Sequence, residues 1–276
     1  MFTLATPRIN SEIEDAIKFV ENVRYQTARL RGWVTIDRVE SIMKNARLFK
    51  IVLLPGMDGT GKLFDPLIEQ CPSEFDSVVV PLPKTQCFTY PDLAEELISQ
   101  LPSDEPFLLL GESFSGPLAL EIACRQPKGL MGVILVASFI RSPRPRWLKW
   151  LPWRLLAKLP MPSFALRWLM TGWSADSSLV DLLRSVLRSV PTHTLSQRLQ
   201  MIFSCDATRS LRDCPTHLLY LQASKDRLVP QSALKLIQKL RPDIQHHAID
   251  GPHLLLQTHP NGCWNAIRAF QNSHCG

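Results

Sequence analysis

Short apolar runs alternate with helical segments along most of the chain. The runs typical of buried strands are Leu48–Leu54, Val78–Leu82, Phe107–Leu110, Gly132–Ala137, Thr216–Ala223 and Gln245–Ile249. Apolar residues recur at helical spacing in the intervening segments Leu63–Glu69, Tyr90–Leu101, Pro117–Cys124, Ser232–Leu240 and Pro260–Asn272. This alternation is typical of a mostly parallel sheet that helices cover on both faces. The pattern therefore predicts a fold of the α/β class.

A different pattern precedes the first strand. Ser11 can cap a helix with Glu14 three positions later, and apolar residues then form one stripe at helical spacing. We expect residues 1–46 to form a helical extension, followed by the α/β domain at residues 47–276. The stripe can pack on that domain or bind a partner, and Met43 can itself be a translation start.

The strand pattern also stops between residues 140 and 208, which predicts a helical insertion rich in Trp, Leu, Arg and Pro. From Ile122 to Ala175 the sequence contains neither Asp nor Glu. The same region holds basic and aromatic side chains at Arg141, Arg144, Arg146, Lys149, Arg154, Lys158, Arg167, Trp147, Trp150, Trp153, Trp168 and Trp173. The insertion is therefore basic and aromatic, and its prolines exclude one long helix.

Ser113 lies where a predicted strand meets a predicted helix. The strand Phe107–Leu110 delivers the serine to a tight bend, and the small residues Gly111, Ser115 and Gly116 allow strand and helix to approach closely. Such a turn presents a hydroxyl as a candidate nucleophile, although a strand-to-helix turn with an incidental serine has the same local sequence.

A serine nucleophile needs a base, and the base needs an acid that orients it. In a parallel sheet these groups lie after the carboxyl ends of strands. Asp226 follows the strand that ends near Ala223, and His253 follows the strand that ends near Ile249. The chain order Ser, Asp, His agrees with this arrangement. Asp250 is the competing acid, but it precedes the turn that holds His253.

Acyl transfer also needs amide donors for the oxyanion. The glycine-rich loop at residues 55–61 follows the first strand, so we expect the backbone amides of Met57 and Phe114 to supply these donors. Phosphate binding is the alternative function of such a loop. It is disfavoured because Leu63 occupies the hydroxyl position of the Walker spacing and no G-x-G-x-x-G is present.

Composition narrows the class of protein. The chain has 276 residues, 45% of them hydrophobic, and can bury a sizeable core. Its net charge of +6 comes without a dominant run of basic and aromatic residues, so no nucleic-acid partner is expected. Seven cysteines lack metal-ligand spacing and are odd in number, which predicts reduced thiols, a cytoplasmic location and no metal.

Neither a signal peptide nor a membrane span is expected. The N-terminal residues lead into the charged Glu12 without an apolar core, and the longest apolar run, Gly129–Ile140, is shorter than the roughly 20 residues of a membrane-spanning helix.

Two motifs carry a family resemblance, Leu-Pro-Gly-Met-Asp-Gly-Thr-Gly at residues 54–61 and Gly-Glu-Ser-Phe-Ser-Gly at residues 111–116. With them, the chain from Leu48 onward resembles the α/β-hydrolase fold superfamily and is similar to bacterial esterase- or lipase-like serine hydrolases. The resemblance implies a Ser113–Asp226–His253 triad, an acyl-enzyme, and neither a metal nor an organic cofactor. Ser115 departs from the usual final glycine of the second motif. The antiparallel strand pair that opens many family members is also missing, unless Trp33–Asp37 supplies one strand.

In related enzymes an insertion at this place forms a helical cap over the active site, which implies an acyl pocket beneath it. The sequence therefore predicts a serine hydrolase that cleaves carboxylic esters with an apolar acyl group. Thioester hydrolysis, acyl transfer to an alcohol, and non-catalytic binding by a protein of this fold stay open as alternatives. The Trp, Leu and Arg content of the insertion also suits peripheral contact with anionic lipid.

Overall fold

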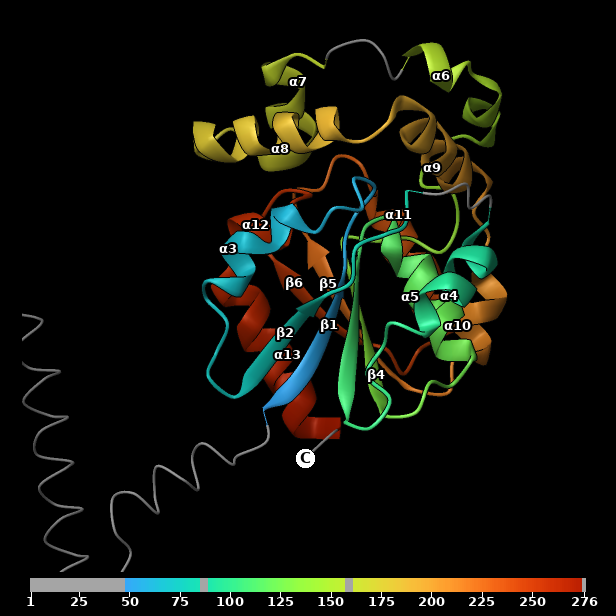
Figure 1. The fold of residues 1–276 in the computed structure, drawn as a ribbon, viewed down its shortest axis with the longest axis vertical. Coiled ribbons are helices and arrows are strands. Elements are labelled where there is room, and N and C mark those ends of the chain that lie inside the picture. The colour runs from blue at the N-terminus through green and yellow to red at the C-terminus, as the bar shows by residue number, and fades with distance from the viewer. Residues whose placement is uncertain (1–47, 85–88, 157–160, 275–276) are drawn as a thin grey trace, which may run out of the picture. The chain divides into compact units, whose positions relative to one another are not determined.

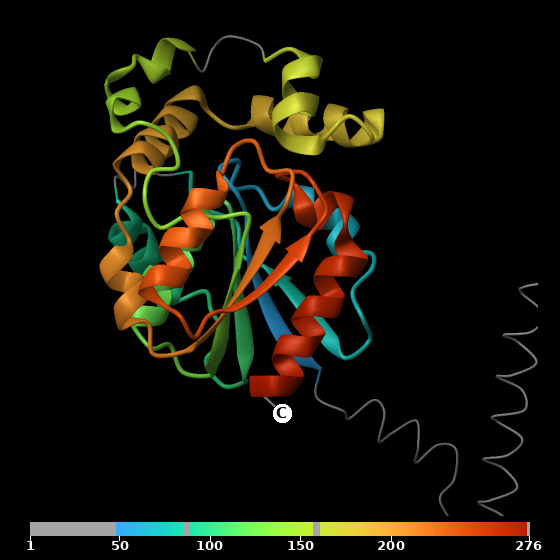
Figure 2. The same cartoon turned by 180° about the vertical axis from the view of Figure 1, so that it is seen from behind.

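The computed structural model describes residues 48–84, 89–156 and 161–274, and Figures 1 and 2 show it from opposite sides. The expected N-terminal extension, including Trp33–Asp37, lies outside the described residues, so its helix and the proposed domain boundaries stay predictions.

The centre of the fold is a six-stranded, all-parallel sheet of strand order β2-β1-β3-β4-β5-β6. The strands are β1 (Phe49–Leu54), β2 (Phe75–Val79), β3 (Phe107–Glu112), β4 (Leu130–Val136), β5 (His217–Ala223) and β6 (Gln245–Ile249). The predicted α/β class with a parallel sheet is confirmed. The predicted strand Val78–Leu82 is wrong in position, because β2 begins at Phe75 and ends before Pro81. β2 is an edge strand and so tolerates the polar Asp76 and Ser77. These two residues interrupt the apolar run by which the other strands are predicted.

Helices cover both faces of the sheet (Figure 1). One core packs beneath α4 (Tyr90–Ile98), α5 (Ser115–Cys124), α10 (Thr208–Asp213) and α11 (Gln231–Leu240). The other packs beneath α3 (Asp65–Ile68), α12 (Leu255–Thr258) and α13 (Pro260–His274). Alternate residues of β1 serve the two cores, since Val52 and Leu54 join the first and Ile51 and Leu53 the second.

The described part of the 140–208 insertion is helical and lies over the carboxyl ends of the strands (Figures 1 and 2). We call this part of the chain the cap. Its helices are η2 (Arg146–Trp150), α6 (Trp153–Leu156), α7 (Ser163–Leu166), η3 (Arg167–Thr171), α8 (Ser177–Ser189) and α9 (Thr192–Ser204). The short 3-10 helix η1 (Lys62–Phe64) follows the glycine-rich loop after β1 and contacts α8. The cap and the ends of the strands therefore enclose the space where parallel sheets bind ligands.

Across the part of the chain that the structure describes, no helix has the length and apolar character needed to span a bilayer.

Candidate active site

Ser113 occupies a sharp turn between β3 and α5. Its φ of 49° lies in the left-handed region, which costs a non-glycine residue on the order of 1–3 kcal/mol. Two hydrogen bonds hold the turn, one from the Ser113 amide to the carbonyl of Val136 at 2.8 Å and one from the Ser138 hydroxyl to the carbonyl of Ser113 at 2.6 Å. The fixed turn presents the Ser113 side chain beyond the end of the sheet.

Glycines on both sides of this turn are required by close packing. A Cβ atom at Gly111 would lie 2.4 Å from the carbonyl oxygen of Ser115, and one at Gly116 would lie 1.9 Å from the Ser138 hydroxyl oxygen. Ser115 itself is fully buried, and its hydroxyl donates a hydrogen bond to the carbonyl of Pro55. The serine that replaces the usual glycine therefore fits, and it ties the turn to the glycine-rich loop.

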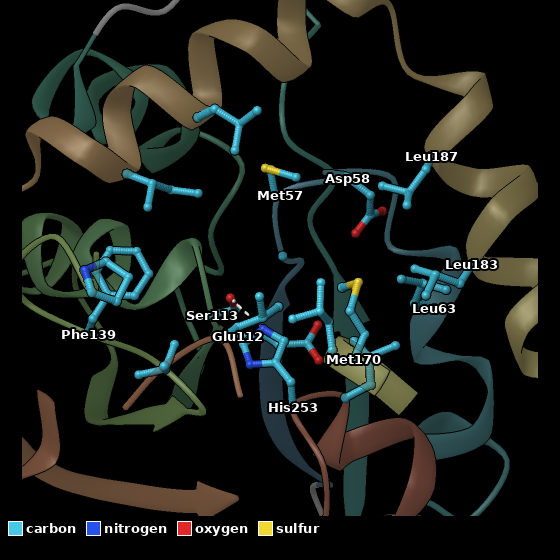
Figure 3. Close-up of a pocket in the computed structure, with 18 of the residues that line it drawn as sticks. Met57, Asp58, Leu63, Glu112, Ser113, Phe139, Met170, Leu183, Leu187 and His253 are labelled. Atoms are coloured by element: carbon cyan, nitrogen blue, oxygen red, sulfur yellow. Dashed lines mark hydrogen bonds between the residues drawn. The ribbon is translucent and has the colours of Figure 1, made fainter. Parts of the chain in front are cut away.

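The structure brings Ser113, His253 and Asp226 into one chain of hydrogen bonds. His253 Nε2 lies 2.9 Å from Ser113 Oγ, and His253 Nδ1 lies 2.7 Å from Asp226 Oδ2. The other carboxylate oxygen of Asp226 accepts hydrogen bonds from the amides of Leu228 and Val229, at 2.8 and 2.9 Å. Figure 3 shows His253 beside Ser113 at the centre of a pocket. All three sequence-predicted residues therefore meet where the strands end.

The surroundings of His253 favour its protonated form. Burial disfavours the imidazolium and so lowers the pKa of His253, but the charge and hydrogen bond of Asp226, with a smaller contribution from Glu112, outweigh burial and raise this pKa overall. A histidine in this setting can accept a proton from the adjacent hydroxyl and remain stabilised as a cation.

The competing acid and thiols lie elsewhere. Asp250 is an exposed residue that accepts hydrogen bonds from Ser224 Oγ and Lys225 Nζ, both at 2.8 Å. Burial raises the pKa of Cys205 and Cys263 to about 12, so these thiols stay protonated. The five described cysteines are all free: Cys71, Cys124, Cys205, Cys214 and Cys263. A cytoplasmic location stays a prediction, and two further cysteines lie outside the described residues.

Of the two expected oxyanion donors, Met57 borders the pocket and Phe114 directly follows the serine in the chain. The Phe114 side chain is buried against Tyr90 with ring centroids 5.1 Å apart. In the turns and loops of the described residues, neither the Met57 amide nor the Phe114 amide donates a hydrogen bond to a backbone carbonyl.

Arg198 joins the cap to the glycine-rich loop, a contact that the sequence did not indicate. This α9 side chain is 4% exposed, and its Nη1 atom donates to the carbonyl oxygens of Met57 at 2.9 Å and Asp58 at 2.8 Å. Its Nη2 atom donates to the carbonyl of Pro83 at 3.0 Å. The sequence does not single out Arg198 for this role. The insertion holds many basic residues, and the acceptors of Arg198 are main-chain atoms distant in the sequence.

Glu112, directly before Ser113, is a second feature that sequence reasoning missed. Its carboxyl group is buried in the pocket wall, and burial, together with the charge of Asp58, raises its pKa to about 7. Gln257 Nε2 donates to Glu112 Oε1 at 3.0 Å, while Gln257 Oε1 has no hydrogen-bond partner among the described residues. A carboxylate at the end of an otherwise apolar strand was the available signal.

A pocket of about 230 Å³ lies beneath the cap and contains Ser113 and His253. In Figure 3, Leu63, Leu183 and Leu187 gather on one side of the serine and Phe139 lies on the other. The rest of the wall is also largely apolar and includes Met57, Pro143, Met161, Leu169, Met170, Leu199, Ile202, Phe203, Leu228, Val229 and Leu254. Such a cavity suits an apolar group attached to a polar reacting centre. The described residues contain no group of three or more side chains able to hold a metal ion.

Comparison with known proteins agrees with this fold. A model of the Alpha/beta hydrolase family matches residues 51–265. A relative from Cellvibrio japonicus, the biotin biosynthesis bifunctional protein BioHC, is 29% identical over 203 residues, which are 68% of this chain. The chain spans about two fifths of that relative, since the match covers 39% of its length.

Solved structures of esterases share the fold. The esterase EaEST from Exiguobacterium antarcticum superposes with a TM-score of 0.70 at 14% identity, covering 81% of this chain and 92% of that one. A thermophilic esterase from Thermogutta terrifontis gives a TM-score of 0.66 at 20% identity, covering 82% of this chain and 90% of that one. At these identities the likeness concerns the fold.

Proposed function

Because the chain belongs to the alpha/beta hydrolase family, we propose that it is a serine hydrolase that cleaves carboxylic esters with an apolar acyl group. The observation that carries the proposal is the hydrogen-bonded series Asp226–His253–Ser113 in an apolar pocket. Within the hydrolase class, this series supports nucleophilic catalysis by serine.

In the proposed mechanism, His253 takes the proton of Ser113 as the hydroxyl oxygen attacks the ester carbonyl. Asp226 stays ionised, fixes the ring through Nδ1, and stabilises the imidazolium. His253 then donates the proton to the departing alcohol, which leaves an acyl group on Ser113. A water molecule, deprotonated by His253, attacks this acyl-enzyme and releases the acid, and the proton returns to Ser113.

The negative charge on the carbonyl oxygen needs donors in both attacks. We assign this role to the amides of Met57 and Phe114, since Met57 borders the pocket and Phe114 follows the nucleophile. The loss of one such donor costs about 3–4 kcal/mol of transition-state stabilisation.

The apolar wall indicates the class of substrate. Leucine, methionine and phenylalanine side chains surround Ser113 on both sides (Figure 3), and burial of each methylene of an acyl chain contributes about 0.8 kcal/mol. We therefore expect kcat/KM to rise with acyl length until the pocket is full.

The test uses p-nitrophenyl esters of graded chain length with the wild type, Ser113→Ala and the control Ser103→Ala, whose serine is exposed in a loop. Ser113→Ala should lose at least about 10³-fold in kcat, while Ser103→Ala should match the wild type. Equal rates from wild type and Ser113→Ala would refute the proposal.

Thioester hydrolysis and acyl transfer use the same residues, so acyl-CoA and a competing alcohol should be offered as alternative substrates. Non-catalytic ligand binding is separated by a fluorophosphonate probe, which should label folded wild-type protein at Ser113. Absence of labelling would favour the binding protein.

The Cellvibrio relative suggests a physiological setting, since its name refers to biotin biosynthesis. We include participation of this chain in biotin biosynthesis as a second, more specific candidate. Its test is a biotin requirement after deletion of the gene, relieved by the wild-type gene and not by the Ser113→Ala gene. Growth of the deletion strain without biotin would refute this role and leave ester hydrolysis untouched.

A further inference from the structure

Large apolar side chains are exposed almost only in the cap. Of the nine such residues among those the structure describes, eight lie between residues 147 and 173, and the ninth is Leu48. The most exposed are Trp150 at 80% and Phe164 at 65%. We call the eight residues the apolar cap surface: Trp147, Trp150, Leu155, Leu156, Met161, Phe164, Trp168 and Trp173. Scattered single exposed hydrophobics need no explanation, but a concentration of this kind marks an interaction surface.

Part of this surface lies on the outer side of the cap. Both views place α6 and α7 on the side of the cap that faces away from the sheet, with α8 and α9 between them and the strands (Figures 1 and 2). Leu155 and Leu156 belong to α6 and Phe164 to α7. A flat or extended partner can therefore reach these side chains without displacing the core.

The charge carried by the segment that holds these apolar residues has one sign, and the nearest acidic residues along the chain, Asp176 and Asp181, belong to the N-cap and body of α8. The sequence from Ile122 to Ala175 contains no acidic residue, and none of the ion pairs found between described residues involves Arg146, Lys149 or Arg154. The Lys149 ammonium instead lies 5.0 Å from the centre of the Trp150 ring. An anionic partner would neutralise these cations, and the partner must also accept apolar side chains.

The surface borders the pocket. Met161 is 47% exposed and also lines the cavity that contains Ser113, as do Pro143 and Arg144 of the same basic segment. An apolar molecule held at the cap surface is thereby close to the pocket wall.

We propose that the apolar cap surface docks on an anionic lipid bilayer. Tryptophan, leucine and phenylalanine would enter the boundary between headgroups and acyl chains, while Arg146, Lys149 and Arg154 contact the headgroup phosphates. A bilayer accounts for both features, because it offers a continuous apolar layer beneath a sheet of negative charge. The idea that the bilayer also supplies the ester substrate rests on the proposed function. Docking of the cap on the bilayer does not depend on that function.

The test measures binding of the full chain, as Ser113→Ala, to vesicles of phosphatidylcholine with and without phosphatidylglycerol. Co-sedimentation and a blue shift of tryptophan emission should report binding to the anionic vesicles, and added salt should weaken it. Trp150→Ser with Phe164→Ser should lower the partition coefficient by about tenfold or more. Arg146→Gln with Arg154→Gln should weaken binding to anionic vesicles alone.

Controls separate docking from folding and catalysis. Leu48→Ser removes an exposed apolar side chain outside the cap and should bind as the parent does. In the active background, Trp150→Ser with Phe164→Ser should keep the melting temperature and the rate on a short water-soluble ester. Absence of binding, or binding unaffected by the cap substitutions, would overturn the proposal, as would capture of an acidic protein without any binding to vesicles. Loss of ester hydrolysis with retained vesicle binding would refute only the proposed function.

Discussion

The guanidinium of Arg198 donates a hydrogen bond to the carbonyl oxygen of Met57 at 2.9 Å, and through the same nitrogen to the carbonyl of Asp58 at 2.8 Å. The cap helix α9 is thereby joined to the loop that we expect to bind the oxyanion. Two consecutive peptide groups held from one point restrict the rotation of the loop, and this orients the neighbouring Met57 amide. On the proposed mechanism, the cap has a second role besides enclosing the pocket.

Replacement of Arg198 should lower kcat more than it raises KM. Methionine keeps the bulk but removes the donors, so we expect kcat to fall by about 10–100-fold through a misplaced oxyanion donor. Lysine offers one point charge in place of a fork and should give a smaller loss. Steady-state kinetics on p-nitrophenyl esters checks this.

The control for this substitution is Arg209→Met, which removes an exposed arginine of α10 that pairs with Asp213. Its kcat should match the wild type. If Arg198→Met lowers the melting temperature but keeps the wild-type kcat per active site, with active sites counted by fluorophosphonate labelling of a separate sample, Arg198 is structural and does not position the loop.

Asp226→Asn should abolish most activity, while Asp250→Asn should have little effect. The asparagine can still bond to His253 Nδ1, but it no longer stabilises the imidazolium and it favours the wrong tautomer, so kcat should fall by about 10⁴-fold. Asp250 is exposed and contacts Lys225 and Ser224, away from His253. The two rates, measured on one ester, decide between the acids, and equal losses would contradict the assignment of Asp226.

The positions of Ser113, Asp226 and His253 were predictable because each follows the end of a parallel strand, and these ends meet at one edge of the sheet. Their proximity needed only the strand pattern and chain order. Arg198 and Gln257 were not predictable, since their partners depend on how helices α9 and α12 pack. The same limit explains β2, where pairing with β1 at the sheet edge outweighs the polar Asp76 and Ser77.

Gly116→Ala should destabilise the protein, although alanine is the better helix former. The new Cβ would lie 1.9 Å from the Ser138 hydroxyl oxygen. The Ser138 side chain is short and buried, and its hydroxyl donates a hydrogen bond to the Ser113 carbonyl, so it has little freedom to move away. Relief of this overlap must move the turn, at a cost of about 1–3 kcal/mol in unfolding free energy. Urea denaturation measures it.

Gly262→Ala in α13 is the matched control, because its Cβ would meet Ile249 at 3.6 Å, an ordinary contact. The helix propensity of alanine should then raise stability by about 0.5–1 kcal/mol. Destabilisation by both substitutions would show that close packing at Gly116 is not the cause.

Glu112→Gln should stabilise the protein at high pH and not at low pH. The folded-state pKa of about 7 lies above the ordinary value of 4.5, so the folded protein binds this proton more tightly than the unfolded chain does. The resulting stability is fully present below pH 4.5 and is lost as the pH rises through 7. The difference in unfolding free energy between Glu112→Gln and wild type should therefore grow, by up to about 3 kcal/mol, between about pH 4.5 and pH 8. Glu69→Gln, at an exposed carboxylate, should show no such growth.

The same substitution should move the pH profile of catalysis. The charge of Glu112 contributes to the raised pKa of His253, and His253 must be neutral to accept the proton of Ser113. Without that charge the pKa of His253 falls, so the acidic limb of kcat/KM for Glu112→Gln should shift to lower pH. Because the pKa of Glu112 is itself about 7, its charge changes within the pH range of the profile, and the wild-type limb should be broader than that of the variant. Profiles of kcat/KM on one p-nitrophenyl ester decide the matter. A limb that stays in place or moves to higher pH would mean that the charge of Glu112 does not act on His253.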